Sequence, residues 1–330
     1  MNQPLVLLFG MPRSGTTWLG KIFDSHPDTL YRHEPDSRGT LNSLPLFAFG
    51  RDAEQYRGFL EGYVGRLPAI RDEKVSASMP IFAKSYYGAF QLALRKLLVF
   101  AMKAASHFLG PLPVPNVVSV ARHSRVSVVW KSIESLGRLG VLARVFPEAR
   151  CVLIFRHPCG YVASVLRGEA KCKFEGGSPS SEDWGVYRML LELPVAKERG
   201  LELSAVQAMA PVERLALRWA LYYEHALTET AGLENVLAVR YEDFCEQPQE
   251  EVQKAFGHCR LPWTRETERF IASSTSHENA EYYSVFKDPK AAAWKWKKEL
   301  AADDVERIMQ VVAPFRAGRY YPPAGQPLSR

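Results

Sequence analysis

The 330-residue sequence has few of the features that would place it in a membrane or in an oxidising compartment. No stretch reaches the ~20 uninterrupted apolar residues that a transmembrane helix needs. The five cysteines are scattered without a CxxC pair, which favours reduced thiols over a disulfide framework or a zinc site. No ligand cluster predicts a bound metal. A strand-like segment begins almost at the first Met and leaves no room for a signal peptide, so we expect a cytoplasmic protein.

The charge balance is also mild. Lys and Arg number 42 and Asp and Glu 36, which gives a net charge of +6, and the charges are interspersed apart from a basic excess in residues 287–298. This pattern suits an anionic ligand and argues against nucleic acid as a partner. An apolar content of 47% is enough for a globular core, and neither a repeat nor a linker divides the chain. We therefore predict one domain over residues 1–330.

The most informative segment follows an apolar run at residues 4–9, which is typical of a buried strand. A turn between Gly10 and Gly15 leads from it into a helical pattern, and strand, glycine turn and helix together form a cradle for a phosphate. Thr16 stands where a nucleoside-triphosphate loop needs its Lys, and Arg13 is the one cation in the turn, so ordinary ATP or GTP chemistry is disfavoured. The candidate anion-binding residues are Arg13, Ser14, Gly15, Thr16, Thr17 and Trp18.

Further apolar runs alternate with helical patterns. Strands are predicted at residues 29–34, 126–132, 151–156 and 235–241, and helices at 53–66, 80–108, 135–146, 161–167, 186–199, 212–231 and 303–312. This order predicts an α/β fold, a P-loop-like, doubly wound parallel sheet flanked by helices. We expect an inserted helical cap at about residues 42–110 to cover the sheet. Its segment 79–109 is also basic and amphipathic enough to contact a membrane surface or a lipid-linked acceptor. Residues 172–183 are typical of a loop that could gate a substrate site.

Three predicted strands end at or near a cation. Arg13 follows the first strand, Lys131 lies at the end of a middle strand, and Arg156 ends another. Because parallel strands place their carboxyl ends at one edge of the sheet, we expect these cations to share a ligand with more than one anionic group. Ser164 lies two helical turns beyond Arg156 and could reach the same anion. Glu34 follows the second strand and should lie in the crevice beside the glycine turn.

Several of these segments resemble the sulfotransferases that use 3′-phosphoadenosine 5′-phosphosulfate. Residues 10–19 are similar to the loop that binds the 5′-phosphosulfate in that family, and residues 152–158 with 162–164 are similar to its 3′-phosphate motif. Segments 146–150, 240–244 and 294–300 also resemble family landmarks. The resemblance implies that Arg13 and the N–H groups of Gly15, Thr16 and Thr17 hold the phosphosulfate and that Trp18 lies near the adenine. It implies that Arg156 and Ser164 bind the 3′-phosphate and that Lys131 stabilises the leaving oxygen. Lys287, Lys290 and Trp296 lie in the region where the family closes over the nucleotide.

The resemblance departs from one branch of the family at the catalytic base. Members that sulfate phenols and steroids carry a His two residues after the Lys, where this chain has Ile133. Carbohydrate-directed and bacterial members use a Glu beyond the loop, so we expect Glu34 to be the base, with His33 and then His26 as alternatives. The implied function is metal-free sulfuryl transfer to a hydroxyl or amine of a carbohydrate or glycolipid. An atypical P-loop kinase and a non-catalytic nucleotide-binding protein stay open as alternatives.

Overall fold

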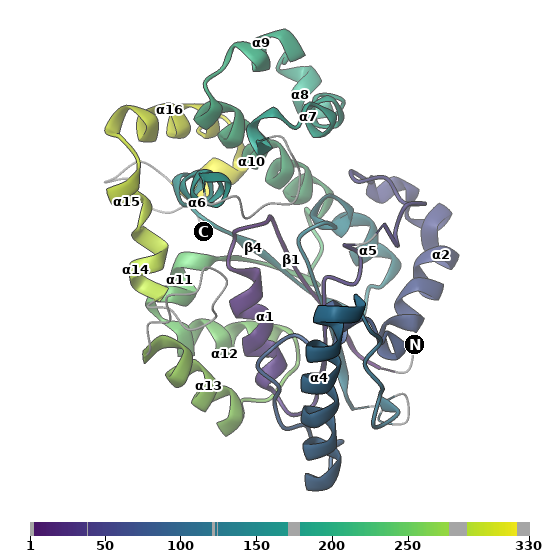
Figure 1. Ribbon diagram of the computed structural model, residues 1–330. Helices are drawn as coiled ribbons and strands as arrows, with labels where there is room; N and C mark the ends of the chain where they lie inside the picture. Colours follow the sequence, from purple (N-terminus) through teal and green to yellow (C-terminus); the bar gives the residue numbers. More distant parts are fainter. Residues whose placement is uncertain are drawn as a thin grey trace.

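The computed structural model describes residues 3–37, 39–120, 123, 125–170, 179–276 and 289–321. Within these ranges, five strands form one parallel sheet in the order β2-β3-β1-β4-β5, of which Figure 1 labels the neighbours β1 and β4. Their bounds are Leu5–Gly10 (β1), Thr29–His33 (β2), Ser127–Ser132 (β3), Arg150–Phe155 (β4) and Val236–Arg240 (β5). The first strand therefore lies in the middle of the sheet, and the predicted parallel α/β architecture is confirmed.

Helices surround this sheet. Their bounds are Thr16–Ser25 (α1), Ala53–Arg66 (α2), Glu73–Ser76 (α3), Ala89–Leu109 (α4), Leu139–Val145 (α5), Pro158–Ala170 (α6), Trp184–Leu191 (α7), Pro194–Glu198 (α8), Leu203–Ala208 (α9), Pro211–Glu229 (α10), Tyr241–Glu246 (α11), Pro248–His258 (α12), Arg265–Ser276 (α13), Pro289–Trp294 (α14), Trp296–Glu299 (α15) and Ala302–Val312 (α16). Short 3₁₀ turns occupy Gly50–Asp52, Leu67–Ala69, Leu136–Arg138, Ser180–Glu182 and Arg316–Tyr320.

The two faces of the sheet bury separate cores, because side chains alternate along each strand. Leu7 and Phe9 of β1 belong to the larger core, which α2, α5, α6 and α10 complete. Leu8 belongs to the smaller core with Ile22 of α1 and Phe256 of α12. All six residues of β1 are buried, as expected of a central parallel strand that is covered on both sides.

The parallel register places the carboxyl ends of neighbouring strands side by side. Gly10 pairs with Ile154 of β4, and Lys131 of β3 pairs with His33 of β2. The turn after β1 and the residue after β2 therefore lie at the same edge of the sheet.

Two expectations about helices are wrong. The helix predicted at 80–108 begins only at Ala89, because Pro80 and Gly88 interrupt the segment before it. The helix predicted at 186–199 is divided between α7 and α8 at Pro194, which begins the second helix.

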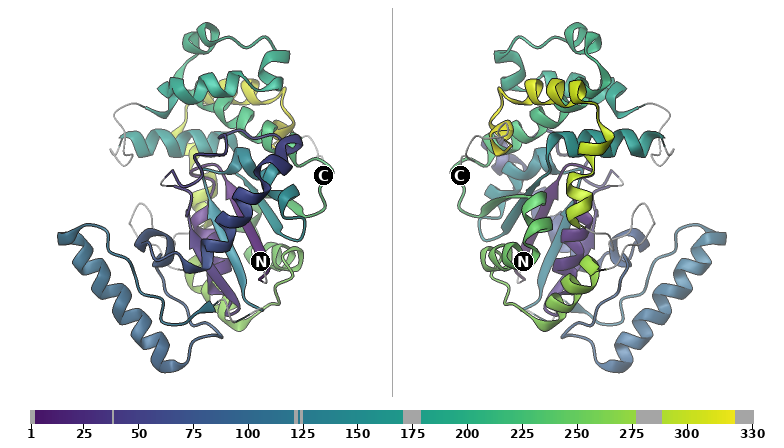
Figure 2. Two further views of the ribbon diagram at one scale, coloured as in Figure 1. Left: turned by 90° about the vertical axis from the view of Figure 1, so that its right-hand side faces the viewer. Right: turned by 90° about the vertical axis from the view of Figure 1, so that its left-hand side faces the viewer.

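The predicted cap over the sheet is also wrong for its longest part. Helix α4 stands away from the sheet (Figure 2), and only Arg95 and Val99 of its residues are buried. Five of its large apolar side chains are exposed instead of packing on the sheet: Phe90, Leu97, Phe100, Phe108 and Leu109. No helix in the described ranges is both long enough and apolar enough to cross a membrane.

Candidate functional site

The turn between β1 and α1 presents an uncapped helix N-terminus. Gly15 is the N-cap residue of α1 with a φ of 82°, and no side chain accepts a hydrogen bond from the first turn at that position. A Cβ on Gly15 would lie 2.1 Å from Cδ2 of Tyr241, so only glycine fits there. Gly10 is constrained in the same way, since its Cβ would lie 2.7 Å from the Ile154 carbonyl oxygen. The first N–H groups of α1 are therefore suited to an anion.

A buried tyrosine supports this turn from behind. The Tyr223 hydroxyl lies 2.9 Å from Ser14 Oγ, accepts the Met11 N–H at 3.3 Å and donates to the Ile154 carbonyl at 2.8 Å. Ser14 is fully buried, so its hydroxyl braces the turn instead of facing solvent. Thr16 is buried as well, whereas Thr17 stays partly exposed at the open side of the turn.

Arg13, Ser164 and Arg156 come together beside the turn. Arg13, whose φ is 70°, donates from Nε to Ser164 Oγ at 3.0 Å. Arg156 is buried and donates from Nη1 to the Arg13 carbonyl at 2.7 Å and from Nη2 to the Ala292 carbonyl at 3.1 Å. The Arg156 guanidinium lies 5.1 Å from the centre of the Tyr241 ring, and its Nε has no hydrogen-bond partner among the described residues.

The two predicted nucleotide-facing tryptophans lie in packed positions. Trp18 is 8% exposed, donates from Nε1 to Ser274 Oγ at 3.1 Å and meets Tyr241 edge-on at 6.3 Å. Trp296 stacks on His157 with ring centroids 4.5 Å apart. Its indole Nε1 is buried and has no partner within the described ranges. Lys290 lies in α14, and Lys287 is outside the described residues.

Glu34 is held between two lysines. It has a φ of 49°, its backbone N–H donates to the Lys131 carbonyl at 2.8 Å, and its Oε1 accepts a hydrogen bond from Lys131 Nζ. Lys74 Nζ lies 3.1 Å from Glu34 Oε2. Burial by itself would raise the pKa of Glu34, but the charge and hydrogen bond of Lys131, together with His33 and Lys74, outweigh it and lower that pKa to about 2. Glu34 is therefore a carboxylate at neutral pH.

Neither histidine is a comparable base. His33 Nδ1 lies 2.9 Å from the Tyr31 hydroxyl, and burial, followed by the Lys131 charge, lowers the pKa of His33 to about 3. His26 is the C-cap of α1, at the opposite end of that helix from the turn. Its Nδ1 accepts the Asp28 N–H at 3.0 Å, and its Nε2 lies 3.0 Å from the Pro262 carbonyl. His26 as a base is thus a wrong expectation, because both of its ring nitrogens are engaged in closing a turn.

Sequence reasoning missed two residues near Glu34. Lys74 comes from α3, forty positions along the chain, and no local pattern links it to Glu34. Asp36 is buried and accepts hydrogen bonds from Trp130 Nε1 at 3.3 Å and from the hydroxyls of Ser132 and Ser135 at 2.5 Å each. The sequence could have indicated Asp36, because it lies only two residues after Glu34 in the segment that follows β2. Its hydrogen bonds fix that segment to the end of β3.

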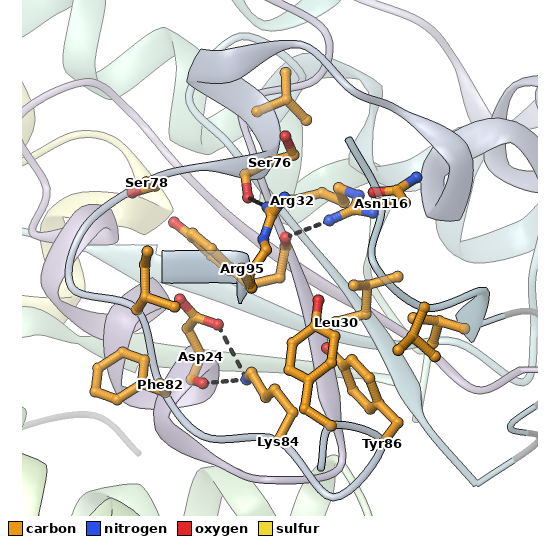
Figure 3. A pocket seen from close by; sticks show the side chains of 16 residues that line it. Asp24, Leu30, Arg32, Ser76, Ser78, Phe82, Lys84, Tyr86, Arg95 and Asn116 are labelled. Atoms are coloured by element: carbon orange, nitrogen blue, oxygen red, sulfur yellow. Dashed lines mark hydrogen bonds and ion pairs between the residues drawn. The ribbon is translucent and has the colours of Figure 1, made fainter. Parts of the chain in front are cut away.

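A pocket next to β2 is separate from this site (Figure 3). No residue of the turn at 10–17 lines it. The charged groups in it are paired with one another or with backbone: Lys84 lies 3.0 Å from Asp24 Oδ1, and Arg95 donates to the Ser76 carbonyl at 2.6 Å. With its charges already engaged, this pocket is not where we expect the anionic ligand.

Comparisons with known proteins found a family and several relatives of this chain. A model described as "Sulfotransferase family" matches residues 4–185. The chain is 25% identical over 252 residues to the nodulation protein NoeE of Sinorhizobium fredii, covering 76% of this chain and 49% of that protein. It is 21% identical over 345 residues to the human protein named carbohydrate sulfotransferase 1, covering 91% of this chain and 75% of that one. The chain thus spans about half the length of NoeE.

Among solved structures, one match is the sulfotransferase domain from the curacin biosynthetic pathway. The two share 16% sequence identity with a TM-score of 0.45, and the match covers 94% of this chain and 98% of that domain.

Proposed function

Because the chain belongs to the sulfotransferase family, we propose that it moves a sulfuryl group from 3′-phosphoadenosine 5′-phosphosulfate to a hydroxyl or amine of an acceptor. The observation that carries this proposal is the uncapped N-terminus of α1, with Gly15 forced against Tyr241 and Arg13 beside it. Such a turn supplies backbone N–H groups and one planar cation to an oxyanion, and it lacks the Lys that a triphosphate would need.

In this proposal the donor spans two anion sites. The N–H groups of Gly15, Thr16 and Thr17, together with Arg13, would hold the phosphosulfate. Arg156 and Ser164 would hold the 3′-phosphate, and the buried Nε of Arg156, which has no partner among the described residues, supports a polar ligand there. Trp18 would pack near the adenine, and Trp296 would belong to the segment that closes over the nucleotide. No residue in this scheme needs to bind a metal.

The chemical step is an in-line displacement at sulfur. The bond from sulfur to the donor's bridging oxygen breaks, a bond from sulfur to the acceptor oxygen or nitrogen forms, and the acceptor proton goes to Glu34. The nucleotide leaves as the 3′,5′-bisphosphate, and the charge on its oxygen would be met by Lys131. In the structure Lys131 donates a hydrogen bond to the Glu34 carboxylate. The proposed step therefore requires the Lys131 ammonium to leave that carboxylate and to bind the donor oxygen instead. That exchange would raise the basicity of Glu34 when the acceptor arrives.

We further propose a carbohydrate or glycolipid as the acceptor. Ile133 removes the histidine expected of a phenol- or steroid-directed member, and one relative is named a carbohydrate sulfotransferase at 21% identity. A screen of hydroxylated acceptors with radiolabelled donor, using sugars, glycolipids and phenols side by side, tests this choice. Transfer to phenols alone would overturn it.

Donor binding is the direct test of the whole proposal. Titration calorimetry should show that 3′-phosphoadenosine 5′-phosphate binds more tightly than adenosine 5′-phosphate and far more tightly than ATP. Tight ATP binding without any response to the 3′-phosphate would instead support a kinase. Binding of the bisphosphate without transfer to any acceptor would support a non-catalytic nucleotide-binding protein.

A further inference from the structure

The outer side of α4 concentrates apolar surface that the fold does not use. In the described part of the chain, seven large hydrophobic side chains are exposed, and five of them lie on this helix: Phe90, Leu97, Phe100, Phe108 and Leu109, between 56% and 84% exposed. The spacings of seven, three and eight residues from Phe90 to Phe108 place those four side chains on one face. Ala93, Ala101 and Ala104 are exposed among them. We call this set of residues the outer face of α4.

The opposite side of α4 fixes the helix in this orientation. Arg95 is buried and donates to two separate segments, to the Ser76 carbonyl at 2.6 Å and to the Pro115 carbonyl at 3.0 Å. Val99 packs in a small cluster with Ala77 and Val114. Figure 3 shows Arg95 pointing toward Ser76, and Figure 2 shows the helix standing off the body. The outer face is therefore held toward solvent by a charged anchor on its inner side.

The charges on α4 indicate what kind of surface could cover this face. The helix contains no Asp or Glu, and apart from Arg95 on its inner side its cationic residues are Lys96 and Lys103. Lys96 is exposed next to Leu97, and Lys103 is partly exposed with its Nζ 3.7 Å from Glu73. An apolar stripe with cations beside it and no anions is the pattern of a helix that lies in the headgroup region of an anionic bilayer.

We propose that the outer face of α4 docks on an anionic phospholipid membrane. The stripe from Phe90 to Phe108 is about 27 Å long at 1.5 Å per residue, which suits a helix lying in the plane of the interface. A second copy of this chain is a poorer occupant, because two such helices would bring lysines together with no acidic residue on either to pair with them. Lys96 would reach the phosphate layer while Leu97 and Phe100 enter the acyl boundary.

Docking would also orient the candidate active site. Helix α3 lies between α4 and Glu34: Glu73 pairs with Lys103 of α4, and the next residue, Lys74, pairs with Glu34. Under the proposed function, and resting on it, a docked molecule would act on acceptors carried by the membrane, such as glycolipid headgroups. The docking itself does not depend on sulfuryl transfer and is tested without it.

Vesicle sedimentation of the full chain tests the proposal. The protein should sediment with vesicles of phosphatidylcholine and phosphatidylglycerol, and weakly with phosphatidylcholine alone. The double substitution L97E/F100E should reduce the bound fraction at least about tenfold, because it removes apolar area and adds like charge to the headgroups. K96E should reduce binding and its dependence on phosphatidylglycerol. Met189→Glu is the matched control, since Met189 is an exposed apolar residue on α7.

Two further measurements make the outcome decisive. Hydrogen exchange of the unmodified protein should slow within residues 89–109 when anionic vesicles are added, which needs no variant to fold. Light scattering with size exclusion should give the same mass for the wild type and L97E/F100E. Absence of vesicle binding, equal binding by L97E/F100E and M189E, or a dimer that L97E/F100E dissociates would each overturn the proposal; the dimer would assign the outer face to a second copy.

Discussion

Lys131 binds Glu34 twice: its ammonium donates to the Glu34 carboxylate, and its carbonyl accepts the Glu34 backbone N–H at 2.8 Å. Lys131 lies near the end of β3 and pairs in register with His33, the last residue of β2, and Glu34 follows His33, so the parallel sheet brings the two residues together. Both side chains are almost fully buried, at 1% and 9% exposure. In that setting the ion pair keeps the candidate base deprotonated but weakly basic, until something else binds the ammonium.

We predict that Glu34→Gln retains donor binding and loses ~10²-fold or more in transfer, because the amide still accepts from Lys131 but cannot take a proton. The measurements are single-turnover transfer with labelled donor and calorimetry with 3′-phosphoadenosine 5′-phosphate. Glu54→Gln is the control, since Glu54 is an exposed glutamate on α2. An unchanged rate in Glu34→Gln on the true acceptor would remove Glu34 as the base.

The same pair predicts how stability depends on pH. Against the effect of burial, Lys131 with His33 and Lys74 lowers the pKa of Glu34 to about 2, below its ordinary value of 4.5. A carboxyl whose pKa is lowered by folding stabilises the folded state at pH values above its ordinary pKa. This contribution is lost as the pH falls from about 4.5 toward 2. Its full size is roughly 3 kcal/mol in the free energy of unfolding. Urea unfolding should therefore show the wild type losing part of its advantage in free energy of unfolding over Glu34→Gln between pH 5.5 and pH 3, mostly below pH 4.5, with some of it remaining at pH 3. A constant difference across that window would contradict the pairing.

A third prediction concerns the turn. Gly15→Ala should abolish donor binding and lower stability, because it combines a positive φ with a Cβ 2.1 Å from the Tyr241 ring. The left-handed conformation alone costs a non-glycine residue about 1–2 kcal/mol, and the contact adds to that. The double variant Gly15→Ala with Tyr241→Ala separates the cost of the left-handed conformation from the cost of the contact with the Tyr241 ring. It should recover part of the thermal stability relative to Gly15→Ala alone. No recovery beyond the effect of Tyr241→Ala by itself would show that the ring does not limit the turn.

Local patterns in the sequence predicted much of this site, and distant contacts account for what they missed. The apolar runs and the glycine spacing placed Arg13, Lys131 and Glu34 at one sheet edge, because parallel strands must end together. The buried orientation of the Ser14 side chain could not be predicted, because it depends on a contact with Tyr223, about two hundred residues later in the chain. The same applies to Lys74 beside Glu34. The sequence pattern of α4 fits either a helix that covers the sheet or one with an outward apolar face. The contacts of Arg95 and Val99 with distant segments set the observed orientation.

The last prediction tests the second anion site. Arg156→Ala should weaken binding of 3′-phosphoadenosine 5′-phosphate by about 10- to 100-fold, the loss expected for one or two charged hydrogen bonds, and adenosine 5′-phosphate much less. Arg156 also donates to the Arg13 and Ala292 carbonyls, so a disturbed turn would weaken both nucleotides alike. The comparison of the two nucleotides therefore separates recognition of the 3′-phosphate from support of the turn.

Arg167→Ala supplies the matched control, because it removes a cation from the same helix, α6, where Arg167 pairs with Glu299. It should leave both affinities unchanged. Ser164→Ala should fall between the two arginine variants, since it removes a neutral acceptor of Arg13 Nε but no charge. Equal losses for both nucleotides in Arg156→Ala, with Arg167→Ala unaffected, would assign Arg156 to bracing the turn through the Arg13 carbonyl. The 3′-phosphate would then need a different partner.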